Sequence, residues 1–209
     1  MTILNLYAGI GGNRKLWGDE HQITAVEWDE ETAKVYQDYF PNDKVIVGDA
    51  HKYLLDYYKD FDFIWSSPPC PTHSRARFWG WQKKRPVYPD MSLYQQILLL
   101  DNTFEGKWVV ENTIPYYPPL IPGKVIGRHI FWSNFKLPNF DAIDGDIHQG
   151  SSREFEELFG YDLSVFDLDA KKKKTMLRNC VSPLTGQHIL NKAMNIVTKS
   201  NTEQATLFP

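Results

Sequence analysis

The stretch Ile3-Leu-Asn-Leu-Tyr-Ala-Gly-Ile-Gly-Gly12 decides the fold of this chain. It begins with a short apolar run, which is typical of a buried β-strand, and it ends in a glycine-rich loop. Because glycine has no Cβ atom and adopts positive φ angles freely, such a loop lets a cofactor approach the backbone closely. The stretch therefore predicts a cofactor-binding α/β domain, and a tight turn that binds nothing is the alternative.

Segments with strand-like and helix-like patterns alternate after this loop. The strand-like segments cover residues 23–26, 45–47, 61–65, 108–110 and 128–132, and the helix-like segments cover residues 30–40, 91–104, 151–159 and 185–197. Alternation of this kind predicts an α/β fold with a mostly parallel, twisted sheet and crossover helices. Ligands of such sheets lie outside the carboxyl ends of the strands, so we expect the site there. We expect the lysine run at 171–174 to be a solvated loop.

Length and composition exclude several classes of protein. A chain of 209 residues with 42% hydrophobic and 23% charged residues is an ordinary globular domain, which excludes a disordered, collagen-like or coiled-coil chain. Its apolar runs are too short to span a bilayer and its N-terminus lacks a signal-peptide pattern, so we expect no membrane contact. The two cysteines predict a reducing compartment, and we expect neither a disulfide framework nor a metal site.

Acidic and aromatic residues end the second and third predicted strands. Glu27 can accept hydrogen bonds from the ribose hydroxyls of a nucleoside, Trp28 can stack on its adenine, and Asp49 can meet the adenine amino group. For each residue alone, a solvated strand end is the alternative. The chain has no GxxxxGK phosphate loop, and its glycine loop is not GxGxxG. We therefore expect a nucleoside cofactor without phosphate, which is S-adenosylmethionine.

A cysteine follows the fourth predicted strand, inside Pro68-Pro69-Cys70-Pro71. Prolines do not fit a helix or a central strand, so they present the Cys70 thiol rigidly at the strand end. We interpret Cys70 as a nucleophile, and a small buried hydrophobic residue is the alternative. A thiolate must form for this role, and a nearby arginine or a developing charge on the substrate can assist it.

The order and spacing of these motifs resemble those of the C5-cytosine DNA methyltransferases. The segments that carry the resemblance are Tyr7-Ala8-Gly9-Ile10-Gly11-Gly12, Glu27-Trp28, Gly48-Asp49, Pro68-Pro69-Cys70, Glu111-Asn112-Thr113 and Arg178-Asn179-Cys180-Val181-Ser182-Pro183-Leu184. They spread over nearly the whole chain. The resemblance implies a Rossmann-like, S-adenosylmethionine-dependent methyltransferase domain at residues 1–198, followed by a flexible tail at 199–209.

The resemblance implies a DNA (cytosine-5-)-methyltransferase that forms a covalent adduct. The target cytosine is flipped out of the stack, Cys70 attacks its C6 atom, and Glu111 hydrogen-bonds or protonates N3. C5 then takes the methyl group from S-adenosylmethionine, which leaves as S-adenosyl-L-homocysteine. Arg128 is assigned to the base from a degraded arginine motif, and the adjacent His129 is the alternative for this contact.

The resemblance also implies a set of cofactor-binding residues. They are Tyr7, Ala8, Gly9, Ile10, Gly11, Gly12, Glu27, Trp28, Asp49, Ala50, Pro69, Asn179 and Val181. Two departures from the family pattern lie close to them. Pro71 replaces the usual glutamine after the Pro-Cys pair, and Thr113 replaces the usual valine after Glu-Asn. Neither departure removes the core chemistry.

The segment after Cys70 is predicted to be a mobile loop that closes on DNA, and a solvated basic loop is the alternative. Its candidate nucleic-acid contacts are Ser74, Arg75, Arg77, Lys83, Lys84 and Arg85. Sequence-reading family members insert a recognition domain after the arginine motif, whereas residues 134–178 offer only a reduced stand-in here. We therefore expect a short or relaxed target sequence, or a preference for single-stranded or otherwise exposed cytosine.

Two other functions stay open at this point. One is cytosine-C5 methylation of RNA or single-stranded nucleic acid, and the other is a noncatalytic regulatory partner that binds cofactor and nucleic acid. The tail resembles the Gln-x-x-Leu-Phe peptide that binds the bacterial sliding clamp, which assigns clamp binding to Gln204, Leu207 and Phe208, with a chance match as the alternative. We expect a cytoplasmic monomer in a bacterial or phage-infected cell, either alone or paired with a restriction enzyme.

Overall fold

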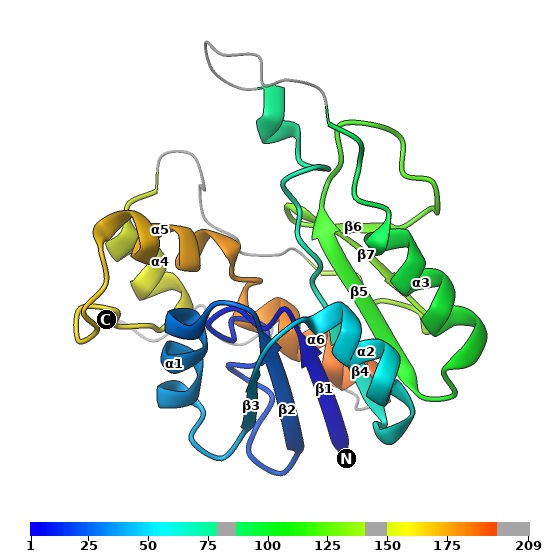
Figure 1. The fold of residues 1–209 in the computed structure, drawn as a ribbon, viewed down its shortest axis with the longest axis horizontal. Coiled ribbons are helices and arrows are strands. Elements are labelled where there is room, and N and C mark those ends of the chain that lie inside the picture. The colour runs from blue at the N-terminus through cyan, green and yellow to red at the C-terminus, as the bar shows by residue number, and fades with distance from the viewer. Residues whose placement is uncertain (79–86, 141–149, 196–209) are drawn as a thin grey trace, which may run out of the picture.

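The computed structural model describes residues 1–78, 87–140 and 150–195. Its strands are β1 (Thr2–Leu6), β2 (Gln22–Glu27), β3 (Lys44–Val47), β4 (Phe63–Ser66), β5 (Lys107–Thr113), β6 (Lys124–Ile126) and β7 (His129–Ser133). They form one seven-stranded sheet in the order β3-β2-β1-β4-β5-β7-β6 (Figure 1). The first five strands are parallel, and only β7 and β6 run antiparallel to their neighbours. The predicted α/β fold with a mostly parallel sheet is therefore confirmed.

Helices cover both faces of this sheet. They are α1 (Glu30–Tyr39), α2 (Ala50–Tyr57), α3 (Ser92–Thr103), α4 (Ser152–Phe159), α5 (Ala170–Asn179) and α6 (Pro183–Ala193). The α2 and α3 helices pack on one face, while α1 and α6 pack on the other (Figure 1). No helix in the described part of the chain has the length and apolar composition to cross a membrane.

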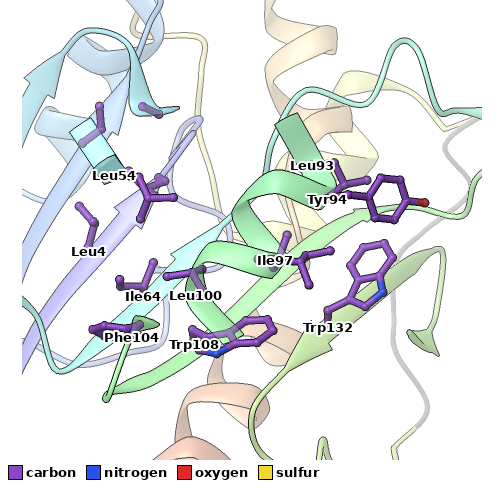
Figure 2. Close-up of a cluster of buried hydrophobic side chains, with 14 of the residues drawn as sticks. Leu4, Leu54, Ile64, Leu93, Tyr94, Ile97, Leu100, Phe104, Trp108 and Trp132 are labelled. Atoms are coloured by element: carbon purple, nitrogen blue, oxygen red, sulfur yellow. The ribbon is translucent and has the colours of Figure 1, made fainter. Parts of the chain in front are cut away.

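The alternation of side chains along each strand builds two cores. Ile64 of β4 packs under α3, whereas Phe63 and Trp65 turn to the opposite face and meet α6. Figure 2 shows the first core, in which Ile97 and Leu100 of α3 lie over the sheet beside two tryptophans. Fully burying one such side chain stabilises the fold by about 1.5–3 kcal/mol. The tryptophans at 17, 65, 108 and 132 are all buried, so they belong to the core rather than to a stacking surface.

The structure differs from the predicted elements in several places. The lysine run at 171–174 lies inside α5, because Asp169 caps this helix and Met176 and Leu177 bury its other face. The eight-residue helix α2 was missed, although Asp49 caps its first turn. Glu111 lies inside β5 rather than at its end, because antiparallel pairing with β7 extends the strand to Thr113.

The strand order places a ligand site between β1 and β4. These two strands are neighbours, yet the chain runs from β1 to β2 and β3 on one side and from β4 to β5 on the other. The crevice at such a reversal, outside the carboxyl ends of the strands, is where α/β proteins bind ligands. The segments that follow β1 and β4 are the glycine loop and the Pro-Cys turn, so the topology brings these two motifs together.

The region predicted to replace a recognition domain contains α4 and most of α5. A capping box at Ser151 and Glu154 starts α4, as its sequence predicts. Phe155 and Leu177 of these helices share a core with Ile10 of the glycine loop and Val35 of α1. These helices therefore pack against the glycine loop and α1. The functional division at residues 134–178 stays a prediction.

A buried ion pair stands behind the glycine loop. Arg14 Nε donates to Asp43 Oδ2 at 2.9 Å and its Nη2 donates to Asp43 Oδ1 at 3.1 Å. The Tyr36 hydroxyl also donates to this carboxylate, at 2.7 Å. The side chains of Arg14 and Asp43 are 3% and 2% exposed, so solvent cannot replace a lost partner. The pair fixes the segment that follows the loop against α1.

We expect the Asp43→Ala variant to lose about 3–5 kcal/mol of unfolding free energy, because it removes the buried counter-ion of the Arg14 guanidinium and leaves it only the exposed Asp19 carboxylate. The melting temperature should fall by roughly 10 °C for a chain of this size. Urea unfolding and calorimetry measure both quantities. The Arg14→Met/Tyr36→Phe/Asp43→Leu variant removes all three polar groups and should recover most of the loss. A single variant that loses under about 1 kcal/mol would contradict this view of the pair.

Candidate active site

A cavity of about 720 Å³ opens at the carboxyl ends of the parallel strands. Cys70, Glu111 and Arg128 line it, and so does every predicted cofactor-binding residue except Gly11. Gly11 does not line the cavity, because the space beside it is taken by the rings of Phe40 and Tyr36, and its cofactor role stays a prediction. One cavity thus unites the predicted cofactor edge with the predicted nucleophile.

The glycine loop needs its glycines for two different reasons. Gly9 has a φ of +56°, and a Cβ atom there would point into open space, which leaves room for a ligand against the backbone. Gly12 instead permits close packing, because its Cβ atom would lie 2.5 Å from the Val181 carbonyl oxygen. The loop therefore faces the cavity at its start and rests on the segment after α5 at its end.

Acidic side chains surround the cofactor half of the cavity. Glu27 Oε2 accepts from the Gly9 backbone N–H at 2.8 Å, and its Oε1 accepts from the Asp29 N–H at 3.0 Å. Trp28 lies at the rim with 74% of its surface exposed, which leaves its ring face available for stacking. Asp49 caps α2 through Oδ1. Lys172 also lines this half, and Asp29 and Glu31 pair with it.

These residues fit S-adenosylmethionine better than a phosphate-bearing cofactor. Three carboxylates, those of Glu27, Asp29 and Asp49, line this half of the cavity and would repel phosphate. The same carboxylates attract a sulfonium and an ammonium group, and carboxylate oxygens match ribose hydroxyl donors. The open space at Gly9 admits the ligand to the backbone.

The Pro-Cys turn is fixed by its own backbone and by a buried histidine. The Cys70 carbonyl oxygen accepts from the N–H groups of His73 and Ser74, both at 2.9 Å. The His73 ring contacts the Asp90 carbonyl oxygen through Nε2 at 3.0 Å and the Tyr117 hydroxyl through Nδ1 at 2.5 Å. Because a carbonyl can only accept, Nε2 carries the proton and Tyr117 donates to Nδ1. Sequence reasoning missed His73 and Tyr117, and no sequence signal marks their roles.

The electrostatics around the Cys70 thiol oppose its ionisation. Burial raises the pKa of Cys70, and the negative charge of Glu111 raises it further. The Thr113 hydroxyl and the Arg128 charge act in the opposite direction and lower this pKa. The thiol therefore rests in its neutral form in the free protein, which agrees with a nucleophile that is activated only when substrate binds.

Glu111 and Asn112 occupy opposite faces of β5. The Asn112 side chain donates to the Pro68 carbonyl oxygen at 2.8 Å and holds the Pro-Cys turn against the strand. Glu111 is only 6% exposed, and its Oε1 lies 3.5 Å from His129 Nε2. Burial, and then the charge of Arg128, hold the pKa of His129 well below its usual value. A neutral imidazole therefore stands beside the carboxyl group.

Arg128 takes a different position from its neighbour. Its Nη1 donates to the Arg178 carbonyl oxygen at 2.9 Å, and its Nη2 donates to the Cys180 carbonyl oxygen at 2.6 Å. These bonds join the turn between β6 and β7 to the segment after α5. Of the two residues that the sequence left open, His129 has its Nε2 atom 3.5 Å from Glu111 Oε1, and Arg128 bonds to the backbone of the cavity wall. The assignment of Arg128 to the base stays a prediction.

The predicted nucleic-acid residues are only partly described. Ser74 lies in the turn after Cys70, and Arg75 and Arg77 lie in the short 3₁₀ helix Arg75–Phe78. Phe78 is 60% exposed, and its ring packs edge-on against Tyr116 at 4.9 Å between centroids. Lys83, Lys84 and Arg85, and the predicted clamp contacts Gln204, Leu207 and Phe208, lie outside the described residues.

Comparison with known proteins gives one family-model match and several similar structures. The family model described as C-5 cytosine-specific DNA methylase matches residues 1–90. Among solved structures, the methyltransferase EhMeth of Entamoeba histolytica matches 95% of this chain and 99% of its own, with a TM-score of 0.60 and 9% identity, which shows the fold. A mutant of DNMT2 from Spodoptera frugiperda covers 54% of this chain and 35% of its own at 25% identity and a TM-score of 0.37. A search of curated proteins gives no match.

Proposed function

We propose, because residues 1–90 match the family model described as C-5 cytosine-specific DNA methylase, that the protein methylates C5 of cytosine in DNA through a covalent adduct on Cys70. One observation carries the proposal. A single cavity places the Cys70 thiol and the Glu111 carboxyl group beside the glycine loop and the acidic cofactor half. The attacking sulfur, the proton donor and the methyl source can therefore meet on one cytosine.

Glu111 and Cys70 act on different atoms of the cytosine ring. Hydrogen bonding or protonation at N3 by Glu111 makes C6 electrophilic, and the Cys70 thiolate then bonds to C6. The electron pair displaced onto C5 takes the methyl group, which S-adenosylmethionine supplies when bound. Loss of the C5 proton to a base then breaks the bond from C6 to sulfur, restores the ring and frees the thiolate. The flipped base must reach this depth because both groups are inside the cavity.

We propose that His129 supports Glu111 by hydrogen-bonding to its carboxyl group. A neutral imidazole donates from one ring nitrogen and accepts at the other, and the two roles exchange with its tautomer. Nε2 of His129 can therefore donate to Oε1 while Glu111 is ionised and accept from it when Glu111 is protonated. An arginine at this place would only donate and would favour the ionised carboxylate. The imidazole thus suits a carboxyl group that must carry a proton to N3.

The region that would read the target sequence is short. Residues 134–151 separate β7 from α4, and the described helices that follow pack into the domain itself. Arg75, which is exposed, and the exposed ring of Phe78 lie just beyond the Pro-Cys turn. A cation and a stacking ring bind any strand with little regard to sequence. We therefore propose a short or relaxed target sequence.

Methyl transfer to three matched substrates tests the proposed function. The full chain is incubated with labelled S-adenosylmethionine and with duplex DNA, a single strand of the same sequence, or tRNA, and the labelled base is then identified. We expect 5-methylcytosine in DNA, with the single strand labelled at least as fast as the duplex. Label confined to tRNA would overturn the DNA assignment and keep the cytosine chemistry. Label on another base, or on no substrate, would overturn the proposed function.

A further inference from the structure

A buried hydroxyl in the cavity wall lacks a hydrogen-bond partner. Thr113 is the last residue of β5, and its Oγ1 has no partner among residues 1–78, 87–140 and 150–195. Buried polar side chains are nearly always hydrogen-bonded, so an exception calls for a physical reason. The backbone of Thr113 is well held, because its N–H donates to Asn112 Oδ1 at 3.0 Å. The backbone that carries the hydroxyl is thus fixed, while the hydroxyl itself has no partner at hydrogen-bond distance in the described residues.

The register of the sheet determines which way this hydroxyl faces. Glu111 and Thr113 are two residues apart on β5, so their side chains share one face of the sheet. His129 lies directly opposite Thr113 on β7 and turns to the same face. All three side chains line the cavity together with Cys70. The Thr113 hydroxyl therefore stands in the group of residues that carries the proposed chemistry.

Few of the side chains around Cys70 can donate a hydrogen bond to its thiolate. Glu111 of β5 opposes a negative charge on the sulfur, and His129 of β7 is neutral. Arg128, from the turn before β7, favours the thiolate, but two of its guanidinium nitrogens already donate to backbone carbonyls. Among side chains, Thr113 is the other group that favours the charged form of Cys70. The valine that is usual at this position has no proton to donate.

We propose that Thr113 is a positioning residue for the nucleophile, whose hydroxyl donates a hydrogen bond to the Cys70 sulfur when the sulfur becomes an anion. A neutral thiol is a weak acceptor, which explains why the hydroxyl has no partner in the resting state. A thiolate accepts a charge-assisted bond that is about twice as strong as a neutral one. The inference rests on the proposed function only for the use of this bond in catalysis.

Alkylation of Cys70 tests the bond without any methyl-transfer assay. The full chain and its variants are treated with iodoacetamide between pH 6 and pH 10, and the modified Cys70 peptide is quantified by mass spectrometry, so that Cys180 does not interfere. Thr113→Val keeps the shape of the side chain and removes the hydroxyl, whereas Thr113→Ser keeps the hydroxyl. We expect Thr113→Val to alkylate about tenfold more slowly near pH 7, with its rate profile moved to higher pH. Thr113→Ser should follow the wild-type profile.

Two results would overturn the inference. One is a Thr113→Val profile identical to that of the wild type. The other is an equal displacement in Thr113→Val and Thr113→Ser, since this would show an effect of packing and not of the hydroxyl. The outcome is separate from that of the proposed function. A displaced profile in a chain that methylates nothing supports the bond and refutes the function, and an unchanged profile in an active enzyme does the reverse.

Discussion

The Cys70→Ser variant should transfer methyl groups at about 10⁻⁴ of the wild-type rate or less, because removal of a covalent nucleophile costs this much in comparable enzymes. Serine keeps the shape of the side chain but does not ionise near neutral pH, and Cys180, which also lines the cavity, is buried. Binding of S-adenosylmethionine should be unchanged within about twofold. Incorporation of labelled methyl groups and titration calorimetry measure the two effects.

Cys180 offers the matched control. It is 5% exposed, its Sγ donates to the Met176 carbonyl oxygen at 3.4 Å, and burial raises its pKa to about 12. Its thiolate is therefore inaccessible at neutral pH. The Cys180→Ala variant keeps the Cβ atom that packs against Gly12 and should retain its activity within a few fold. If Cys70→Ser kept a tenth of the activity, a covalent adduct on Cys70 would be ruled out.

The first half of the fold is readable from the sequence because its signals are local. The strands that begin at Thr2, Gln22 and Lys44 are short apolar runs, and the carboxyl ends of parallel strands meet at one edge whatever the details of packing. Glu27 and Cys70 could therefore be placed in one site from the order of strands and motifs alone. Both residues line the same cavity in the structure.

The signals that failed are those that tertiary contacts override. The lysine run at 171–174 indicates a solvated loop, yet Met176 and Leu177 bury the other face of α5. Lys172 pairs with Glu31 of α1 and with the N-cap residue of that helix, Asp29. Gly11 belongs to a glycine loop, but the rings of α1 and its C-cap take up the space beside it. Neither contact can be read from the residues nearby in sequence.

The orientation of side chains in the site depends on long-range pairing. Arg128 and His129 are adjacent in sequence, and nothing local decides which of them shares a face of the sheet with Glu111. The antiparallel register of β5 and β7 places His129 opposite Thr113, on the face that also carries Glu111. The partnerless hydroxyl of Thr113 becomes visible only at that stage. The sequence shows its replacement of valine, but not what its hydroxyl meets.

The Glu111→Gln variant should change two rates in opposite directions. Methyl transfer should fall by about 10²–10⁴-fold, because the amide has no acidic proton for N3 of cytosine. Alkylation of Cys70 by iodoacetamide near pH 7 should become severalfold faster. Burial and then the charge of Glu111 raise the pKa of Cys70, so neutralising Glu111 lowers this pKa and increases the thiolate fraction below it.

These opposite changes distinguish a catalytic acid from a residue that merely supports the fold. A misfolded cavity would slow methyl transfer and alter alkylation without regard to pH, whereas the loss of one charge moves the alkylation profile to lower pH with its shape intact. Slower alkylation of Glu111→Gln would contradict the assigned electrostatics. The repulsion is also reciprocal, so a negative charge on the Cys70 sulfur favours a proton on Glu111. A thiolate beside a carboxylic acid is the state that attack at C6 requires, and the closeness of these two groups in one buried cavity favours that state over a pair of anions.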